Sequence, residues 1–331
     1  MKHLILSIIT AGFIFPTNVS TAEDTSNLLR PAHTYSIVAR DAQTGQLGVA
    51  VQSHWFSVGS SVAWARAGVG AVATQSFVEV SYGPLGLDLM AAGKTAPQAL
   101  TSLLASDEHT DVRQVGMVDS NGNVVAHTGE NAISEHCDIV GEGFSVQANM
   151  MLNSTVCSAM VAAYEGSDGD LAERLMLALE AAQGEGGDVR GKQSAAMLVV
   201  SGDASVPAWS GRLIDLRVED SMTPIVEMRR LLGVARAYTK MDEGDAFMTE
   251  GNIEKAVEAY SAAEAMNPDN HEMVFWHAAT LAGAGEVEES LPLFDKAFAA
   301  WPQWRDLVPR LVEVGLLPDD DAMVDKILEQ R

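Results

Sequence analysis

The sequence predicts an α+β domain of antiparallel sheets and helices, followed by a wholly helical repeat domain. Two observations carry this prediction. Hairpins and paired helices come in blocks up to about residue 218, instead of the regular alternation of strand and helix in a doubly wound sheet. After Met222 the pattern is helical throughout, and similar residues recur at a spacing of 34. A short apolar run, Leu4 to Phe15, precedes both regions.

The N-terminal segment reads as an export signal. Lys2 supplies a positive start, and the run from Leu4 to Phe15 is too short to cross a bilayer. Small residues before and at Ala22 predict cleavage after Ala22, so that residues 1–22 are a signal peptide and residues 23–33 a pro-segment or linker. We therefore expect a periplasmic or secreted bacterial protein with no membrane span.

The first domain, expected over residues 34–220, opens with two strands around a turn. A second hairpin is predicted around Asn121-Gly122, which is a strong turn signal. Thr95 and Pro97 mark the start of a helix as its cap and first turn. The expected strands are 34–40, 47–53, 69–75, 112–119, 124–128, 144–150, 195–200 and 212–218, and the expected helices are 85–92, 96–106, 155–164 and 170–182.

The second domain, expected over residues 221–331, carries the repeat. The pairs 34 residues apart are Gly251 and Gly285, Tyr260 and Phe294, Ala263 and Ala297, and Pro268 and Pro302. This period, with small residues where helices cross and proline at the end, is typical of tetratricopeptide repeats. A helix over 223–242 leads into the repeats and the segment 304–314 caps them. Their predicted role is a protein-docking groove, or a dimerisation or stabilising unit.

Charge and cysteine content narrow the function further. The formal net charge is −24, which argues against nucleic acid and anionic membranes as partners. Solubility explains this charge, and a cationic partner is the alternative. Cys137 and Cys157 either form a disulfide in an oxidising compartment or remain separate thiols. His136 stands beside Cys137, but no second pair with ligand spacing follows, so we expect no metal.

Polar side chains stand at the ends of otherwise apolar strands. Such residues need partners when they are buried, and amides among them can donate to a developing oxyanion. Ordinary structural hydrogen bonding explains each of them equally well. The predicted pocket residues are Gln52, Ser53, His54, Gln75, Gln193 and Ser194, and the predicted oxyanion donors are Gln147 and Asn149.

Thr34 opens the first predicted strand. A threonine at a free chain end carries a hydroxyl nucleophile and, with an α-amine pKa of about 8, its own general base. Arg40 and Asp41, at the end of the same strand, are predicted to tune that amine, with Arg66 as an alternative source of positive charge. Asp41 equally suits the start of the turn that follows.

Several long segments resemble one bacterial family. They are Thr-Tyr-Ser-Ile-Val-Ala-Arg-Asp from Thr34, Gly-Val-Ala-Val-Gln-Ser-His-Trp-Phe from Gly48, Phe-Ser-Val-Gln-Ala-Asn-Met-Met from Phe144 and Gly-Asp-Val-Arg-Gly-Lys-Gln-Ser from Gly187. From about Thr34 to Val218 the chain resembles the domain-of-unknown-function family 1028, whose fold is assigned to the N-terminal-nucleophile hydrolases. The resemblance implies a four-layer αββα sandwich that cleaves a small amide or peptide without a cofactor.

Many members of that family begin at Met-Thr, whereas here eleven residues, Glu23 to His33, would remain ahead of Thr34 after signal cleavage. A second cut at the His33–Thr34 bond is therefore required for catalysis. The first hypothesis is an exported amidohydrolase with Thr34 as nucleophile. The alternative is a non-catalytic exported scaffold that docks a protein through its helical repeats; a metal hydrolase using His54, His127 or His136 is a minor third. The sequence does not determine the oligomeric state, and a homo-oligomer is one of the alternatives.

Overall fold

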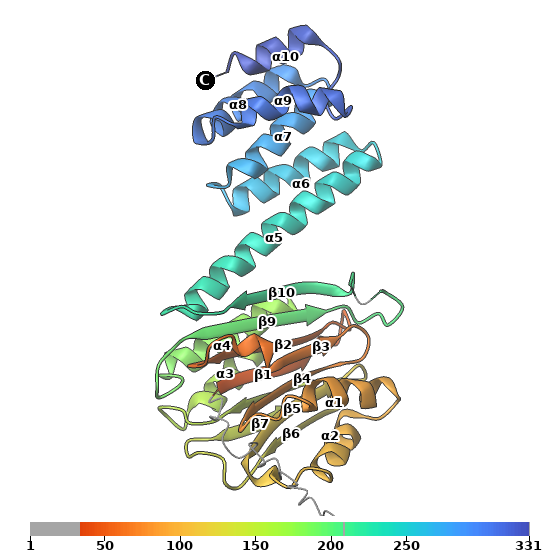
Figure 1. Ribbon diagram of the computed structural model, residues 1–331. Helices are drawn as coiled ribbons and strands as arrows, with labels where there is room; N and C mark the ends of the chain where they lie inside the picture. Colours follow the sequence, from red (N-terminus) through yellow and green to blue (C-terminus); the bar gives the residue numbers. More distant parts are fainter. Residues whose placement is uncertain (1–33, 208, 331) are drawn as a thin grey trace, which may run out of the picture. The chain divides into compact units, whose positions relative to one another are not determined.

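The computed structural model describes residues 34–207 and 209–330, and it confirms antiparallel sheets followed by a helical region (Figure 1). The predicted signal peptide, the segment 23–33 and the His33 side of the predicted cleavage site lie outside the described residues. A six-stranded sheet has the order β10-β9-β2-β1-β8-β7, and a four-stranded sheet has the order β3-β4-β5-β6. The strands are β1 (Thr34–Arg40), β2 (Leu47–Ser53), β3 (Ala63–Arg66), β4 (Gly70–Ser76), β5 (Arg113–Asp119), β6 (Val124–Thr128), β7 (Cys137–Gly141), β8 (Phe144–Ala148), β9 (Ser194–Val200) and β10 (Arg212–Val218).

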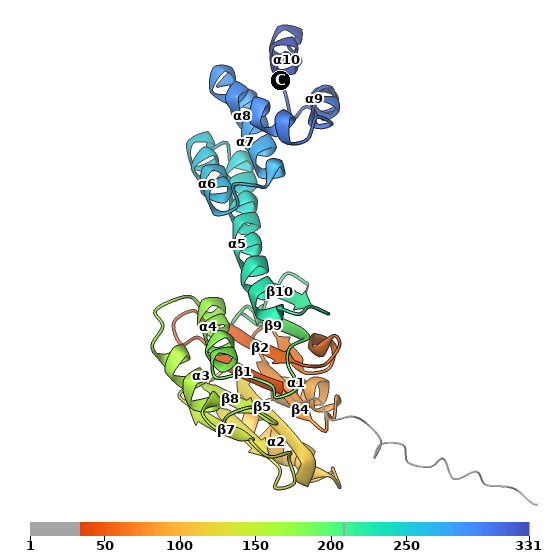
Figure 2. The same ribbon diagram turned by 90° about the vertical axis from the view of Figure 1, so that its left-hand side faces the viewer.

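The two sheets face each other, and helices cover their outer faces (Figures 1 and 2). Helices α1 (Tyr82–Ala91) and α2 (Ala96–Leu104) pack on the four-stranded sheet. Helices α3 (Val156–Glu165) and α4 (Leu171–Gly184) pack on the six-stranded sheet. Thr95 caps α2 with a capping box as the sequence predicts. Helix α1 begins three residues before the predicted Leu85, because Pro84 is tolerated in a first turn.

Two strands, β3 and β7, were missed by the sequence prediction. Both are edge strands, with four and five residues, and each pairs with only one neighbour. Short edge strands owe their conformation to that pairing more than to local propensity. A disulfide joins Cys137 on β7 to Cys157 on α3, so this edge of the sheet is tied covalently to the helix layer.

Alternation along β1 divides its side chains between two cores. Tyr35, Ile37 and Ala39 pack against α3 and α4, whereas Val38 packs between the sheets. The inter-sheet side of β1 is therefore apolar at Val38 but polar at Thr34 and Ser36, both fully buried. The polar part lies at the end of the sandwich where β1 begins and where β2, β4 and β8 end. This end is called the Thr34 end below.

Helix α5 (Pro224–Thr249) contributes to two cores in succession. Its first half places Ile225, Met228 and Leu232 in the core of α3 and α4. Its second half places Ala237 and Met241 in a separate core with α6. The predicted end of this helix near Asp242 is therefore wrong. The helix continues past Gly244, an interior glycine that the ring of Tyr260 approaches so closely that a Cβ would lie 2.5 Å from it.

Ion pairs hold the first half of α5 against α4. The Arg229 guanidinium donates to Glu173 at 2.6 Å and to Glu180 at 2.7 Å, and Arg236 donates to Asp170 at 2.7 Å. Two such forked contacts from one arginine fix orientation as well as supplying attraction. The carboxylates all lie on α4 or at its N-terminal cap.

The remaining helices follow the predicted period. Helix α6 (Ile253–Met266) recurs 34 residues later as α8 (Val287–Ala300), and α7 (His271–Gly283) stands between them. Helix α9 (Trp304–Glu313) occupies the predicted capping segment, and a further helix, α10 (Asp321–Leu328), was not predicted. Tyr260 and Phe294, the pair at equivalent repeat positions, are both buried.

Candidate functional site

Thr34 lies at the start of β1 with its side chain between the two sheets and no exposed surface. Its Oγ1 is 3.3 Å from the Oγ of Ser53, the residue opposite it on β2. Its carbonyl oxygen accepts hydrogen bonds from the backbone N–H of Asn149 at 3.1 Å and from Gln75 Nε2 at 3.3 Å. Three strands thus fix the backbone and hydroxyl of this one residue.

Gln75 is the centre of a buried polar network between the sheets. Its Oε1 accepts from the Ser36 hydroxyl at 2.6 Å, and its Nε2 lies 2.7 Å from Gln114 Oε1 and 3.2 Å from the Gln147 carbonyl. Gln114 in turn donates to Thr128 Oγ1 and to the carbonyl of Ala148, both at 2.9 Å. Because buried amides cost free energy when unpaired, this network specifies which strands meet at the Thr34 end.

The two predicted oxyanion donors belong to this network. Gln147 Nε2 donates to Ser36 Oγ at 2.9 Å, and its Oε1 accepts from Ser145 at 3.1 Å. The amide packs over Gly116, where a Cβ would lie 2.4 Å from Oε1, so a larger residue there would displace the Gln147 amide. Asn149 Nδ2 donates to Gln114 Oε1 at 2.8 Å. Both side chains therefore serve structural hydrogen bonds in this state.

Arg40 and Asp41 do not reach Thr34. They lie at the opposite end of β1, about 20 Å away at the rise of an extended strand, so the predicted tuning of the Thr34 amine is wrong. Asp41 instead organises the turn, accepting from the N–H groups of Gln43 and Thr44. Arg66 is equally remote, since it begins the turn into β4 at Gly70.

The predicted pocket residues separate into three groups. Ser53 and Gln75 adjoin Thr34, as described above. Gln52 pairs with Tyr35, so its buried amide lies on the face toward α4 and away from the Thr34 hydroxyl. The others lie in or beside the loops: His54 is exposed, Gln193 donates to Asp220 at 3.2 Å, and Ser194 Oγ accepts from the Val58 N–H at 3.1 Å.

Strained backbone gathers at the Thr34 end. Among the described residues, four non-glycine residues have positive φ: Ser57, Ser76, Glu135 and Met150. Ser76 is the last residue of β4 and is fully buried, Glu135 and Met150 lie two residues from the ends of β7 and β8, and Ser57 lies in the loop after β2. Such conformations cost about 1–3 kcal/mol each and cluster at sites where structure serves function. No comparable residue lies at the opposite end of the described sheets.

Sequence reasoning missed two buried groups at this end. Gln114 was overlooked, although an amide in the strand Arg-Gln-Val-Gly-Met-Val is the same signal that identified Gln75. Asp188 was also missed: its carboxylate accepts from the His54 N–H at 3.1 Å and pairs with Arg190 at 2.7 Å. Burial and the negative charge of Asp188 raise the pKa of Tyr35 well above its usual value.

Asp107 supports the strained loop after β4. It pairs with Arg113 at 2.7 Å, and Arg113 also donates to the Phe77 carbonyl at 2.6 Å. Burial opposes ionisation, but hydrogen bonds from Arg113, the His109 N–H and Tyr82 lower the pKa of Asp107 to about 2.

We expect a pH-dependent contribution to stability from Asp107. Its folded pKa lies below the unfolded value of about 3.9, so the contribution is present above about pH 4 and is lost as the pH falls toward 2. Urea unfolding of Asp107→Asn should show a loss of about 2 kcal/mol near neutral pH that shrinks in acid. The exposed Asp168→Asn is the control. An Asp107→Asn loss that stays constant from neutral pH to pH 2 would contradict this account.

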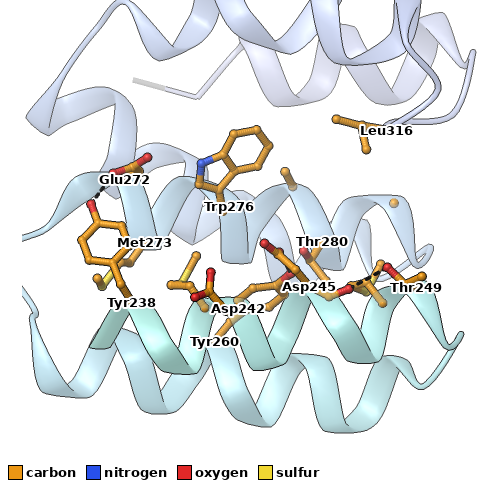
Figure 3. A pocket seen from close by; sticks show the side chains of 14 residues that line it. Tyr238, Asp242, Asp245, Thr249, Tyr260, Glu272, Met273, Trp276, Thr280 and Leu316 are labelled. Atoms are coloured by element: carbon orange, nitrogen blue, oxygen red, sulfur yellow. Dashed lines mark hydrogen bonds between the residues drawn. The ribbon is translucent and has the colours of Figure 1, made fainter. Parts of the chain in front are cut away.

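A groove in the helical repeats is the second candidate site. It lies between the second half of α5 and α7, with a volume of about 550 Å³ (Figure 3). Met241 and Met273 contribute buried apolar surface, and Trp276 on α7 is half-buried. Asp242 on α5 and Glu272 on α7 line its edges. The sequence predicted a docking groove in this domain but not these residues.

Within residues 34–207 and 209–330, no group of three or more histidine, cysteine, aspartate or glutamate side chains is placed to hold a metal ion. In the same ranges no helix has the length and apolar character needed to span a membrane.

Comparisons with known proteins agree with the two regions. The model of a family of unknown function, DUF1028, matches residues 34–228, and a tetratricopeptide repeat model matches residues 241–303. The crystal structure of protein SPO2555 from Silicibacter pomeroyi, a DUF1028 protein, is similar with a TM-score of 0.54 and 27% identity. That similarity covers 61% of this chain and 88% of the other. No curated protein matches.

Both predicted resemblances are thus confirmed. The first match begins at Thr34, where β1 begins, and it ends within α5, whose second half enters the repeat match. The chain therefore belongs to the family of unknown function DUF1028 and carries tetratricopeptide repeats after that domain.

Proposed function

We propose that this chain is the precursor of an exported N-terminal-nucleophile hydrolase, activated by a cut at His33–Thr34. The observation that carries the proposal is the position of Thr34. It is the first residue of β1 and of the family match, it lies between two facing antiparallel sheets, and its hydroxyl is oriented by Ser53. Helices outside both sheets are what an αββα sandwich of this superfamily requires.

The chemistry needs few groups. A freed α-amine, with a pKa of about 8, takes the Thr34 hydroxyl proton, and Oγ1 attacks the carbonyl of a small amide or peptide. The amine of the substrate leaves with that proton, and water then hydrolyses the ester on Thr34. Hydrogen bonds from Asn149 and Gln75 to the Thr34 carbonyl hold the nucleophile in place throughout. In the uncut chain the Thr34 nitrogen is an amide, which cannot act as the base.

The test is the mass of the mature chain and its labelling by a β-lactone. Protein purified from its native cells should begin at Thr34 and gain the whole mass of the lactone, because Oγ1 opens the ring to form an ester. Thr34→Ala should take up no lactone, whereas Thr44→Ala, in the exposed turn after β1, should be labelled like the wild type. A native chain that retains residues 23–33, or equal labelling of Thr34→Ala, would overturn the proposal.

A second candidate function is protein docking through the helical repeats. The repeat match and the groove between α5 and α7 support it. The two functions are compatible, since α5 carries the repeats directly after the sheet domain. Docking would bring a protein to the enzyme or, if the His33–Thr34 bond is never cut, would be the activity of the chain.

A further inference from the structure

We infer that the groove between α5 and α7 binds a peptide segment of a partner protein in which a lysine or arginine stands next to apolar residues. This inference rests on the docking function proposed above and names the chemistry of the partner. Asp242, Asp245 and Glu272 line the groove, and none of its described lining residues is a lysine or arginine.

The carboxylates differ in how they are satisfied. Asp245 accepts from the Tyr260 hydroxyl at 2.6 Å, and Glu272 accepts from the Tyr238 hydroxyl at 2.5 Å. Both bonds come from neutral donors, which orient the carboxylates but leave their charge uncompensated. Asp242 is exposed and forms no ion pair with the described residues. The groove therefore offers fixed negative charge to an incoming cation.

The opposite side of the groove suits the same cation. Figure 3 shows Trp276 on α7 and Asp242 and Asp245 on α5 as lining residues of the same groove. A lysine or arginine side chain in the groove would meet the carboxylates of α5 and the aromatic ring of α7, and both attract positive charge. The cation is the feature of the ligand that this arrangement selects.

The apolar part of the ligand follows from the rest of the lining. Met241, Met248 and Met273 give the groove flexible, polarisable surface that adapts to different apolar side chains. Leu316, which is 60% exposed, extends this surface at one end. Apolar residues on either side of the cation in the peptide would cover this apolar surface of the groove.

A second copy of this chain is a poor occupant. From Asp242 to Arg331 the sequence has 20 acidic residues and 6 basic ones, so two such regions repel each other. The charge of the repeats is complementary to a basic segment of another protein, and the inference commits to that partner.

The experiment measures binding of short labelled peptides to the full chain by fluorescence anisotropy at physiological salt. The test peptide alternates lysine with leucine; one comparison peptide has glutamate for each lysine, and the other has serine for each leucine. We expect the lysine–leucine peptide to bind best. Asp242→Lys and Trp276→Ala should each weaken its binding about tenfold, in the range of a central contact residue. Glu258→Lys, which makes the same charge change on an exposed part of α6 outside the groove, should change it less than about twofold.

The outcomes separate the inference from the docking proposal. If Glu258→Lys weakens binding as much as Asp242→Lys, or if the serine peptide binds equally well, the attraction is general charge and the inference is wrong. If the glutamate peptide binds better and Trp276→Ala removes that binding, the groove docks peptides but the cationic preference is wrong. If Trp276→Ala changes the binding of none of the peptides, the cationic preference and the docking of peptides in this groove are both wrong. Circular dichroism checks that each variant folds. Asp242 is exposed and unpaired among the described residues, so Asp242→Lys should fold normally and its effect on binding can be interpreted even if Trp276→Ala does not fold.

Discussion

Gln75→Leu should lower the free energy of unfolding by about 3–4 kcal/mol, although leucine is close to glutamine in size. The substitution removes the acceptor for the Ser36 hydroxyl and the donor to Gln114 Oε1. The same Nε2, which carries two protons, also lies within hydrogen-bond distance of the Thr34 and Gln147 carbonyls, and they lose that contact as well. All of these groups are fully buried between the sheets, where a lost hydrogen bond is replaced poorly by water.

Urea unfolding measures the effect, with Gln43→Leu as the control. Gln43 is exposed in the turn after β1, so its substitution should change stability by less than about 0.5 kcal/mol. The double variant Gln75→Leu with Gln114→Leu should cost less than the sum of the single variants, because both partners of the shortest amide pair are then removed together. A Gln75→Leu loss under about 1 kcal/mol, or strict additivity in the double variant, would show that the network contributes little.

Phe275→Ala should lower the free energy of unfolding of the helical repeats by about 3–5 kcal/mol. Phe275 has no exposed surface, and its ring stacks on Trp304 with centroids 4.4 Å apart. It also makes edge contacts with Trp276 at 5.4 Å and Phe294 at 5.8 Å. Removing the ring leaves a cavity among large side chains on three different helices, which cannot close without moving those helices.

Thermal unfolding followed by circular dichroism measures this effect. Repeat units depend mainly on their neighbours, so we expect a separate low-temperature loss of helical signal while the sheet domain stays folded. Val314→Ala, at a residue that is 69% exposed, is the control and should leave the transition unchanged. If Phe275→Ala instead shifts one single transition of the whole chain, the repeats and the sheet domain unfold as a unit and the expected independence is wrong.

Local signals predicted most of the elements. The turn from Asp41 to Gly45 predicted β1 and β2 as a hairpin, Asn121-Gly122 predicted the hairpin of β5 and β6, and Thr95 with Pro97 predicted the start of α2. The signals failed where conformation depends on a neighbour. β3 and β7 are strands because they pair at a sheet edge, and α5 continues past Asp242 because its two halves pack into two cores.

The candidate site was predicted less well. Thr34, Ser53 and Gln75 do meet, as residues at strand ends can when the sheets face each other. Arg40 and Asp41 were misassigned, although strand geometry alone excludes them: six residues of extended chain span about 20 Å. Gln52 was grouped with Ser53, yet successive residues of a strand point to opposite faces, and Gln52 faces α4.

The amino-acid sequence by itself determined the two-region organisation, the 34-residue helical period, the acidic character of the repeats and Thr34 as the first residue of a strand. These properties depend on periodicity, turn chemistry and composition, which short segments carry. Only the tertiary structure decided that Ser36, Gln75 and Gln114 share one buried network, and that Asp242 and Trp276 line one groove. These groups lie far apart in sequence, and their meeting depends on how sheets and helices pack to bury apolar surface, a global property that no local pattern specifies.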